Sequence, residues 1–338
     1  YESACASQPA EIAPHQLEPT QADEMMLAYF TSGTTADPKL VPRDHSYAKA
    51  HEITGRFWLD LNDNDVHWTL SDTGWAKAAW GMLFGPWMAG AAIVLYNGDI
   101  RFDAVCHLKL IAKLRVSTFC APPTVYRLFT QHDLTTYDLS SIRHSVSAGE
   151  PLNPEVIRVW KETTSTVVHD GYGQTETVNV VANFPFMPVK PGSMGKAAPG
   201  FTVSIVNDDG LPLSNNDIGH IAIKVTEPHP PGLFHGYYNG PNDLDRSSFR
   251  HGWYYTGDTA YCDNDGYIWF VGRSDDIISS ASYRISPFEV ESALQAHEAV
   301  AESAVIGKPD SLRGEIVTAY VVLADRKSTR LNSSHVRI

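Results

Sequence analysis

Strand-like and helix-like segments alternate along the chain from about residue 20 to about residue 200. The strand candidates are Met25–Phe30, Val116–Cys120, Ile142–Val146 and Thr166–His169. Helix candidates begin at Pro122-Pro123 and at Pro154, because proline favours the first turn of a helix. Parallel strands need long crossover connections, usually helices. The alternation therefore predicts an α/β fold in which helices cover a parallel sheet.

Short strands separated by tight turns replace this alternation between about residues 200 and 273, which predicts a barrel-like β subdomain. A polar break, Ser274–Asp276, precedes a small α+β module, in which Ser286, Pro287 and Glu289 are spaced as a capping box. We therefore expect a large domain over 1–273, a hinge at 274–276 and a small domain over 277–325. Residues 326–338 are polar and aperiodic and look foreign to the domain.

Composition argues against several classes of protein. The net charge of −13 disfavours a broad nucleic-acid surface. The four cysteines show no CxxC spacing, which indicates reduced thiols. The histidines form no HxxxH pair, so the sequence predicts no zinc site. Ala78–Tyr96 is uncharged, but glycines at 81, 85 and 90 break it into short pieces, so it predicts a buried helix and a strand, not a membrane span. No signal peptide is visible, which favours the cytoplasm, or the mitochondrial matrix if a presequence precedes Tyr1.

The stretch Thr31–Lys39 follows the first strand candidate and is rich in hydroxyl groups. Its side-chain and backbone donors can bind phosphate oxygens, Gly33 lets the backbone approach closely, and Lys39 supplies positive charge. It is not a Walker A loop, since Pro38 precedes the lysine and Leu40 follows it. An ordinary Ser/Thr/Gly turn is the alternative.

A second glycine-containing segment, Asp170–Thr177, comes directly after a strand candidate. Tyr172 offers an aromatic face to a purine. Thr175 and Glu176 lie where the chain leaves the sheet, which is where open α/β folds bind ligands. A carboxylate beside phosphates is a natural ligand for Mg²⁺. The alternative is a glycine turn with a solvated glutamate.

Two further segments add charged groups. Asp258, at the end of Trp253–Asp258, can accept hydrogen bonds from ribose hydroxyls, although a turn aspartate is the simpler interpretation. Arg273 and Arg284 flank the predicted hinge, and guanidinium groups suit phosphate and carboxylate, although surface salt bridges would explain each arginine alone.

Taken together, and in this order, the segments resemble the adenylate-forming superfamily of acyl-CoA synthetases, luciferases and peptide-synthetase adenylation domains. The resemblance extends to about Asp325 and is greatest to the medium-chain acyl-CoA synthetases. The stretches that carry it are Tyr29–Thr35, Ser71–Trp75, Tyr172–Glu176, Lys190–Gly195, Ser282–Glu291 and Pro309–Glu315.

The resemblance implies a carboxylate–CoA ligase that uses ATP, Mg²⁺ and coenzyme A. It would form an acyl-adenylate and then an acyl-CoA thioester, on medium-chain fatty or aromatic acids. Catalytic roles are implied for Thr175, Glu176 and Arg284, with Glu176 as the metal ligand, and Asp275 would be the hinge. Contacts with ATP are implied for Thr31, Ser32, Gly33, Thr34, Thr35, Lys39, Gly149, Glu150, Pro151, Asp170, Gly171, Tyr172, Gly173, Gln174, Thr175, Asp258 and Arg273. Coenzyme A would contact Ala281, Ser282, Tyr283 and Arg313, and the acyl pocket would include Trp75 and Trp80, for which aromatic core packing is an equal explanation.

Three departures from the family pattern stand out. Ala36 and Ser282 occupy positions where the family usually has glycine. The family's catalytic lysine and the front third of its large domain have no counterpart in these 338 residues. We therefore expect the parent protein to be an enzyme and this chain to be impaired. The alternatives are an adenylating enzyme with a carrier-protein acceptor and a non-catalytic nucleotide-binding remnant. The oligomeric state and acyl chain length stay open.

Overall fold

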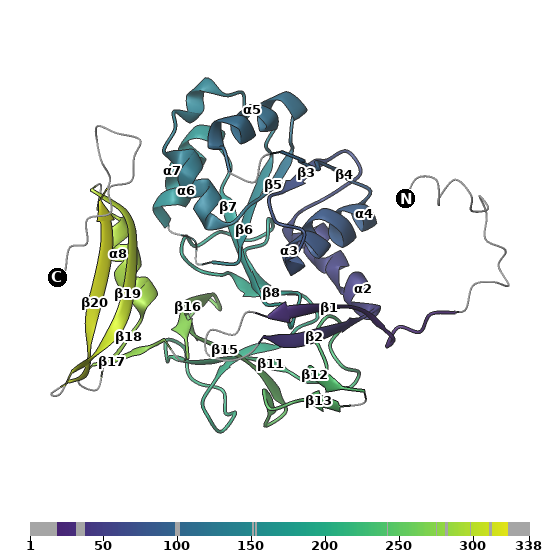
Figure 1. Ribbon diagram of the computed structural model, residues 1–338, viewed down its shortest axis with the longest axis vertical. Helices are drawn as coiled ribbons and strands as arrows, with labels where there is room; N and C mark the ends of the chain where they lie inside the picture. Colours follow the sequence, from purple (N-terminus) through teal and green to yellow (C-terminus); the bar gives the residue numbers. More distant parts are fainter. Residues whose placement is uncertain are drawn as a thin grey trace.

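The computed structural model describes residues 19–31, 38–98, 102–150, 152, 154–241, 243–274, 276–280, 283–297, 299–310 and 313–323. Figure 1 shows three parts: a helix-covered sheet, a group of antiparallel strands beneath it, and a small sheet with one helix at the side. The predicted α/β class, with a second α+β part, is confirmed.

The helix-covered sheet has seven strands in the order β4-β3-β5-β6-β7-β8-β9. Neighbours from β4 to β7 run parallel, whereas β8 and β9 pair antiparallel. The bounds are β3 (Val66–Thr69), β4 (Ala92–Ile93), β5 (Thr118–Cys120), β6 (His144–Ala148), β7 (Val168–Gly173), β8 (Asn179–Ala182) and β9 (Lys196–Ala197).

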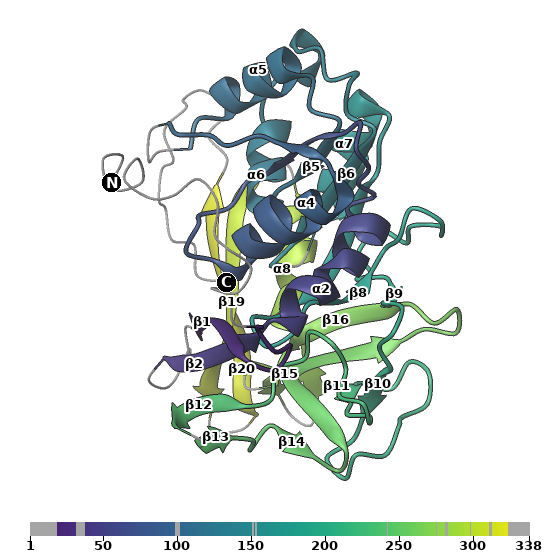
Figure 2. The same cartoon turned by 90° about the vertical axis from the view of Figure 1, so that its right-hand side faces the viewer.

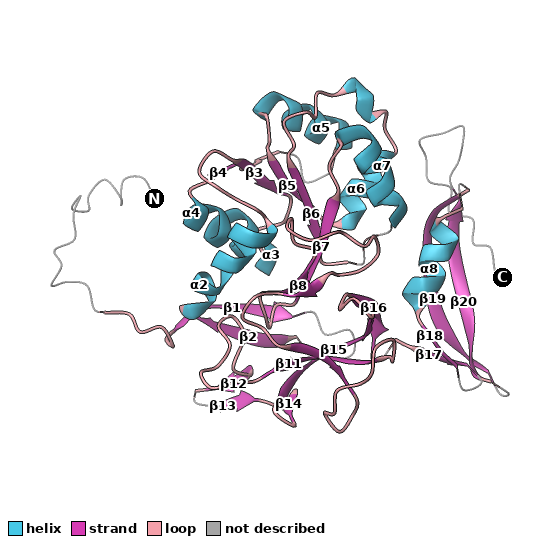
Figure 3. Ribbon diagram, turned by 180° about the vertical axis from the view of Figure 1, so that it is seen from behind, coloured by secondary structure: helices cyan, strands magenta, loops and turns pink. Residues whose placement is uncertain are grey.

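Helices cover both faces of this sheet (Figures 1 and 3). The first group is α2 (Ser46–Ile53), η2 (Thr54–Trp58), α3 (Ala76–Ala78), η3 (Ala79–Phe84) and α4 (Gly85–Ala89). The second group is α5 (Ala104–Leu114), α6 (Pro123–Thr130), η4 (Leu134–Thr136) and α7 (Pro154–Thr164).

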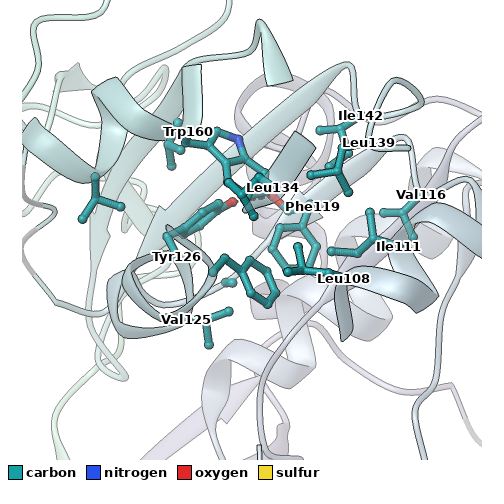
Figure 4. Packing of buried hydrophobic residues seen from close by; sticks show 14 of the residues in the cluster. Leu108, Ile111, Val116, Phe119, Val125, Tyr126, Leu134, Leu139, Ile142 and Trp160 are labelled. Carbon is teal, nitrogen blue, oxygen red and sulfur yellow. Dashed lines mark hydrogen bonds between the residues drawn. The ribbon is translucent and has the colours of Figure 1, made fainter. Parts of the chain in front are cut away.

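The core beneath the second group holds those helices on the strands. Figure 4 shows Leu108 and Ile111 of α5, Tyr126 of α6 and Trp160 of α7 gathered around Phe119 of β5. All five side chains are fully buried. Each such burial contributes about 1.5–3 kcal/mol, so this cluster fixes the strands whose carboxyl ends carry the site described below.

The predicted helix and strand of the uncharged segment are confirmed, but Gly81 and Gly85 do not break the helix as predicted. Residues 76–89 are helical throughout as α3, η3 and α4, and the helix ends at Gly90, which has φ of 77°. Gly85 instead permits close packing, because a Cβ there would lie 2.7 Å from the Trp80 carbonyl oxygen and 3.3 Å from the Cα of Gly55 in η2. The expected strand follows as β4. None of the helices in the described part of the chain is long and apolar enough to cross a membrane.

The antiparallel part consists of two hairpins and a five-stranded sheet. The sheet runs β10-β11-β15-β14, and β16 pairs with β15. Among the described residues, the strands of the predicted barrel-like subdomain therefore do not close into a barrel. Figure 2 shows the hairpin β12–β13 beside β2. The bounds are β1 (Met25–Thr31), β2 (Lys39–Asp44), β10 (Val203–Val206), β11 (Gly219–Lys224), β12 (Tyr237–Gly240), β13 (Asp243–Asp245), β14 (Phe249–Arg250), β15 (Trp253–Cys262) and β16 (Ile268–Arg273).

The small part is a four-stranded antiparallel sheet with one helix. Its order is β18-β17-β20-β19, and the helix α8 lies between this sheet and the larger body (Figure 3). The bounds are β17 (Ile278–Ser280), β18 (Tyr283–Ile285), α8 (Pro287–Gln295), β19 (Val300–Asp310) and β20 (Gly314–Leu323).

The predicted start of α8 is confirmed. Ser286 is its N-cap, and the Ser286 Oγ accepts a hydrogen bond from the Glu289 backbone N–H at 3.2 Å. The same hydroxyl donates to the carbonyl oxygen of Val271 in β16. Phe288 adds a second link, since its ring lies 6.2 Å from that of Phe270. The helix start therefore joins the small part to the larger body.

Candidate active site

Two adjoining cavities open where the parallel strands end. The larger has a volume of about 480 Å³ and the smaller about 260 Å³. Both are lined by Gly149 and Glu150, just after β6, and by Gly173 and Gln174, at the end of β7. Gly149 has φ of 102°, a conformation that glycine adopts without strain. The segment after β6 and the end of β7 therefore form the wall that the two cavities share.

The segment Asp170–Gly173 belongs to β7 and does not form the turn that the sequence predicted. Gly171 pairs with Ala148 on one side and with Ala182 on the other. It must be glycine, because a Cβ there would lie 2.5 Å from Cζ2 of Trp58. The turn comes later, at 174–178, and includes Thr175 and Glu176.

Asp258 lies at the centre of a hydrogen-bond network beside the smaller cavity. It is only 6% exposed, and its Oδ2 accepts from the Tyr172 hydroxyl at 2.5 Å and from Gln174 Nε2 at 2.8 Å. Arg273 is its partner across β15 and β16, with Nε 3.9 Å from Asp258 Oδ1. Burial raises the pKa of Asp258, and Tyr172 and Arg273 oppose that rise. The alternative interpretation of Asp258 as a turn aspartate is therefore wrong, because the residue is a buried part of β15.

Asp170 is the second buried carboxyl group at the smaller cavity. It is 6% exposed, and its Oδ1 accepts from the backbone N–H of Gly171 at 2.9 Å. Burial raises its pKa well above the ordinary value. Asp170 and Tyr172 therefore reach the same cavity from one strand.

Glu176 is held by a tyrosine that the sequence gave no reason to select. Its Oε1 accepts from the Tyr237 hydroxyl at 2.8 Å, and the side chain is 8% exposed. Burial and the Glu176 carboxylate raise the pKa of Tyr237. The ring of Tyr237 also lies under Lys39, whose Nζ is 4.5 Å from the ring centroid. The base of the predicted phosphate loop and the predicted metal ligand are thus joined through one side chain.

The predicted phosphate loop connects β1 to β2. Thr31 and Lys39 are paired across this hairpin, and the Thr31 hydroxyl donates to the Lys39 carbonyl oxygen at 3.4 Å. The Lys39 ammonium also lies 4.0 Å from Asp245. The rest of the predicted loop, Ser32, Gly33, Thr34 and Thr35, lies outside the described residues.

A buried arginine supports the turn that carries Glu176. Arg43 of β2 is 2% exposed and donates from Nη1 to the Glu176 carbonyl oxygen at 2.9 Å, and from Nη2 to the carbonyl oxygen of Gly232. Its guanidinium group lies 4.0 Å from the ring centroid of Tyr47. Burial lowers the pKa of Arg43. Sequence reasoning missed this residue because its partners lie far along the chain.

The larger cavity has aromatic walls and one basic side chain. The predicted pocket residues Trp75 and Trp80 line it; Trp75 is 61% exposed, and Trp80 packs 5.5 Å from Trp58. Thr175 lines the cavity too. Lys77, which sequence reasoning missed, donates from Nζ to the Ala148 carbonyl oxygen at 2.6 Å, and burial lowers its pKa. The available signal was a lone charge between two tryptophans.

Several predicted residues belong to the small part or to undescribed positions. Pro151, Asp275, Ala281 and Ser282 lie outside the described residues. The backbone of Tyr283 pairs with Ser280 and that of Arg284 with Ser279 in β17 and β18. Arg313 is exposed, and its backbone N–H donates to Asp310 Oδ1 at 2.8 Å. Arg313 is not among the described residues that line the two cavities.

The chain belongs to the AMP-binding enzyme family. The model of that family matches residues 2–238, and the model of the AMP-binding enzyme C-terminal domain matches residues 289–337. The predicted resemblance to adenylate-forming enzymes is therefore confirmed.

Curated relatives include acyl-CoA ligases of different organisms. The chain is 48% identical over 310 residues to the mitochondrial acyl-coenzyme A synthetase ACSM3 of Rattus norvegicus, covering 91% of this chain and 53% of the relative. It is 46% identical over 307 residues to 4-hydroxybutyrate–CoA ligase 1 of Metallosphaera sedula, covering 90% of this chain and 54% of the relative. The chain thus spans about half the length of the curated relatives it matches.

Solved structures share the fold. Brucella canis acyl-CoA synthetase is 37% identical, with a TM-score of 0.76 over 97% of this chain and 59% of that one. The anthranilate CoA ligase AuaEII in complex with anthranoyl-AMP is 33% identical, with a TM-score of 0.81 over 89% and 57%. ATP-bound MatB from Rhodopseudomonas palustris is 28% identical, with a TM-score of 0.85 over 97% and 63%.

Proposed function

We propose that the protein containing this chain is an AMP-forming carboxylate–CoA ligase. In the first half-reaction, an oxygen of the substrate carboxylate attacks the α-phosphorus of ATP and pyrophosphate leaves. In the second, the coenzyme A thiolate attacks the acyl carbon and AMP leaves. The observation that carries the proposal is the shared wall of the two cavities, because an acyl-adenylate needs its acyl and nucleotide parts in adjoining sites.

We assign the nucleotide to the smaller cavity. Asp258, held by Tyr172 and Gln174, would accept from the ribose hydroxyls, and Arg273 would add positive charge beside them. The segments Gly149–Pro151 and Asp170–Tyr172 would flank the adenine ring. A network that is already hydrogen-bonded needs little reordering when the ligand arrives, which favours binding.

The polyphosphate would extend toward Lys39 and Thr31, with Ser32, Gly33, Thr34 and Thr35 completing the loop. Glu176 suits a Mg²⁺ site, because one of its oxygens is held by Tyr237 and a magnesium ion on ATP needs only one or two protein carboxylates. When bound, Mg²⁺ would neutralise charge on the phosphates. No cluster of three or more metal-ligating side chains occurs within the described ranges.

The larger cavity would hold the acyl group. Thr175 lines it next to the shared wall, so its hydroxyl can contact the substrate carboxylate and the α-phosphate. Trp75 and Trp80 would pack against the acyl chain. We propose medium-chain fatty or aromatic acids as the substrate class.

The second half-reaction would use the small part. We propose the division 1–273, 274–276 and 277–325, with Asp275 as the hinge of a rotation between half-reactions and 326–338 outside the domain. Arg284 would approach the acyl-phosphate group, and Ala281, Ser282, Tyr283 and Arg313 would contact coenzyme A.

We propose the cytoplasm or the mitochondrial matrix as the compartment of the protein. The matrix is proposed because the mammalian relatives are named mitochondrial.

Titration of the purified chain with AMP tests the nucleotide site. Replacing Asp258 by Asn should weaken AMP binding at least about tenfold, because a charged acceptor of hydrogen bonds is lost. Asp217→Asn is the matched control, since Asp217 is exposed and is not among the described residues that line the cavity. Equal affinities for the two variants and the unaltered chain would refute the assignment. The ligase activity itself is tested with the full-length protein, by acid-dependent release of AMP from ATP and coenzyme A.

A further inference from the structure

Tyr237, the first residue of β12, lies between two groups that reach the site from distant parts of the chain. Its hydroxyl donates to Glu176 Oε1 at 2.8 Å, and the centroid of its ring lies 4.5 Å from Lys39 Nζ. Lys39 begins β2, whereas Glu176 belongs to the turn after β7, between Thr175 and Thr177, which line the larger cavity. One tyrosine therefore contacts a cation and an anion at the same time, through different parts of its side chain.

The backbone of Glu176 is fixed independently of this tyrosine hydroxyl. The backbone N–H of Phe234 donates to the Glu176 carbonyl oxygen at 2.9 Å, and Arg43 Nη1 donates to the same oxygen at 2.9 Å. The ring of Phe234 packs against that of Tyr237, with centroids 4.9 Å apart. Because the backbone is held, the direction of the carboxylate depends on the side-chain torsions of Glu176. The hydrogen bond from Tyr237 restrains those torsions before any ligand binds.

The hairpin β12–β13 also holds the ammonium group of Lys39 in place. Tyr237 pairs with Asp245 across this hairpin, and Asp245 Oδ2 lies 4.0 Å from Lys39 Nζ. Neither contact is an N–H···O hydrogen bond, because the ring attracts the ammonium through its face and 4.0 Å is beyond hydrogen-bond range. The Lys39 side chain is 46% exposed. Its ammonium is thus positioned but can still donate to oxygen atoms of a ligand.

We propose that Tyr237 is a positioning residue for the first half-reaction. Its hydroxyl orients the Glu176 carboxylate toward the magnesium ion on ATP, and its ring holds the Lys39 ammonium beside the phosphates. This inference rests on the ligase function proposed above and deepens it, because Tyr237 is not among the described residues that line the two cavities. Groups that orient a metal-binding carboxylate strongly affect the affinity for the metal, although they do not touch it.

Calorimetric titrations of the 338-residue chain with MgATP, with ATP in EDTA and with AMP test this inference. Tyr237→Phe removes only the hydroxyl, so it should weaken MgATP binding about tenfold and the binding of metal-free ATP and AMP by less than about twofold. Tyr237→Leu removes the ring as well. It should bind metal-free ATP about two- to fivefold more weakly than Tyr237→Phe does, which is the effect of a lost exposed cation–π contact.

Two further variants serve as controls for these titrations. Tyr238→Phe should leave all three affinities unchanged, because Tyr238 follows on the same strand and successive side chains of a strand point to opposite faces. Glu176→Gln removes the carboxylate that Tyr237 is proposed to orient. In that background, Tyr237→Phe should weaken MgATP binding by less than about twofold further, whereas additive losses would overturn the inference.

Other outcomes reject the inference in distinguishable ways. Equal weakening of AMP, metal-free ATP and MgATP by Tyr237→Phe would show that the tyrosine only supports the fold. Unchanged MgATP affinity would show that its hydroxyl does not orient the metal ligand, and equal metal-free affinities of the Phe and Leu variants would reject the role of the ring. These results leave the proposed function standing if the unaltered chain binds AMP and MgATP. Failure of the unaltered chain to bind either nucleotide would remove the proposed function and this inference together.

Discussion

The two cavities differ in how their polar groups are held. Around the smaller one, the side chains of Asp258, Tyr172 and Gln174 bind one another directly. Around the larger one, Lys77 has a single backbone partner, and Asn179 Oδ1 has none within the described residues. A self-satisfied network is rigid before any ligand binds, whereas unpaired groups depend on what enters. We therefore expect the smaller cavity, to which we assign the nucleotide, to suit one fixed ligand, and the specificity for the acid to lie at the larger cavity.

The support beneath the turn that carries Glu176 gives the largest expected effect. Arg43→Met should lower the free energy of unfolding by about 3 kcal/mol or more, because two buried carbonyl oxygens lose their charged donor. Urea unfolding measures the change, with Lys109→Met as the exposed control. A loss below about 1 kcal/mol would mean that the turn carrying Glu176 does not depend on Arg43.

Gly171→Ala tests the strand that separates the cavities. The new methyl group would meet the Trp58 ring at 2.5 Å, so we expect a destabilisation of about 1–3 kcal/mol. Trp58 lines only the larger cavity, and Asp258 lines only the smaller. Binding of acyl-adenylate mimics should therefore suffer more than binding of AMP. Equal loss of both affinities would contradict the separation of the two cavities.

Acid titration gives the smallest and most selective effect. The folded-state pKa of Asp258 lies above its ordinary value of 3.8, mainly because of burial. Between those two pKa values the folded chain keeps a proton that the unfolded chain has lost, so Asp258 makes the free energy of unfolding fall as pH rises through the interval. The Asp258→Asn variant should lack this contribution. Urea unfolding at several pH values across that interval would reveal this contribution as a difference between the two chains in the slope of the free energy of unfolding against pH. Parallel plots would count against a buried, ionisable Asp258.

The sequence predicted those features that depend on local order. Alternating elements indicated the sheet, and the cap at Ser286 was visible from three nearby residues. The grouping of Tyr172 with Asp258 at one cavity followed from the resemblance, and their hydrogen bond gives it a physical form. Motif order carries such information because each segment keeps its own place at a strand end.

Contacts between distant segments could not be predicted. Arg43 and Glu176 are 133 positions apart, and neither neighbourhood marks the other as its partner. The extension of β7 through Gly171 was missed because the glycines that suggested a turn instead make room for the Trp58 ring. Lys77 was missed for a related reason: its environment comes from the end of β6, which lies 71 positions further along the chain.

The Ser286 hydroxyl makes two hydrogen bonds with one oxygen atom. It accepts from the first turn of α8 and donates to Val271 in the neighbouring β16. If the small part swings away, only the donated bond is lost, and water can replace that acceptor at a net cost of about 1 kcal/mol. The accepted bond travels with the helix. Undocking would therefore leave the first turn of α8 capped by Ser286, and the helix would keep its N-terminal end.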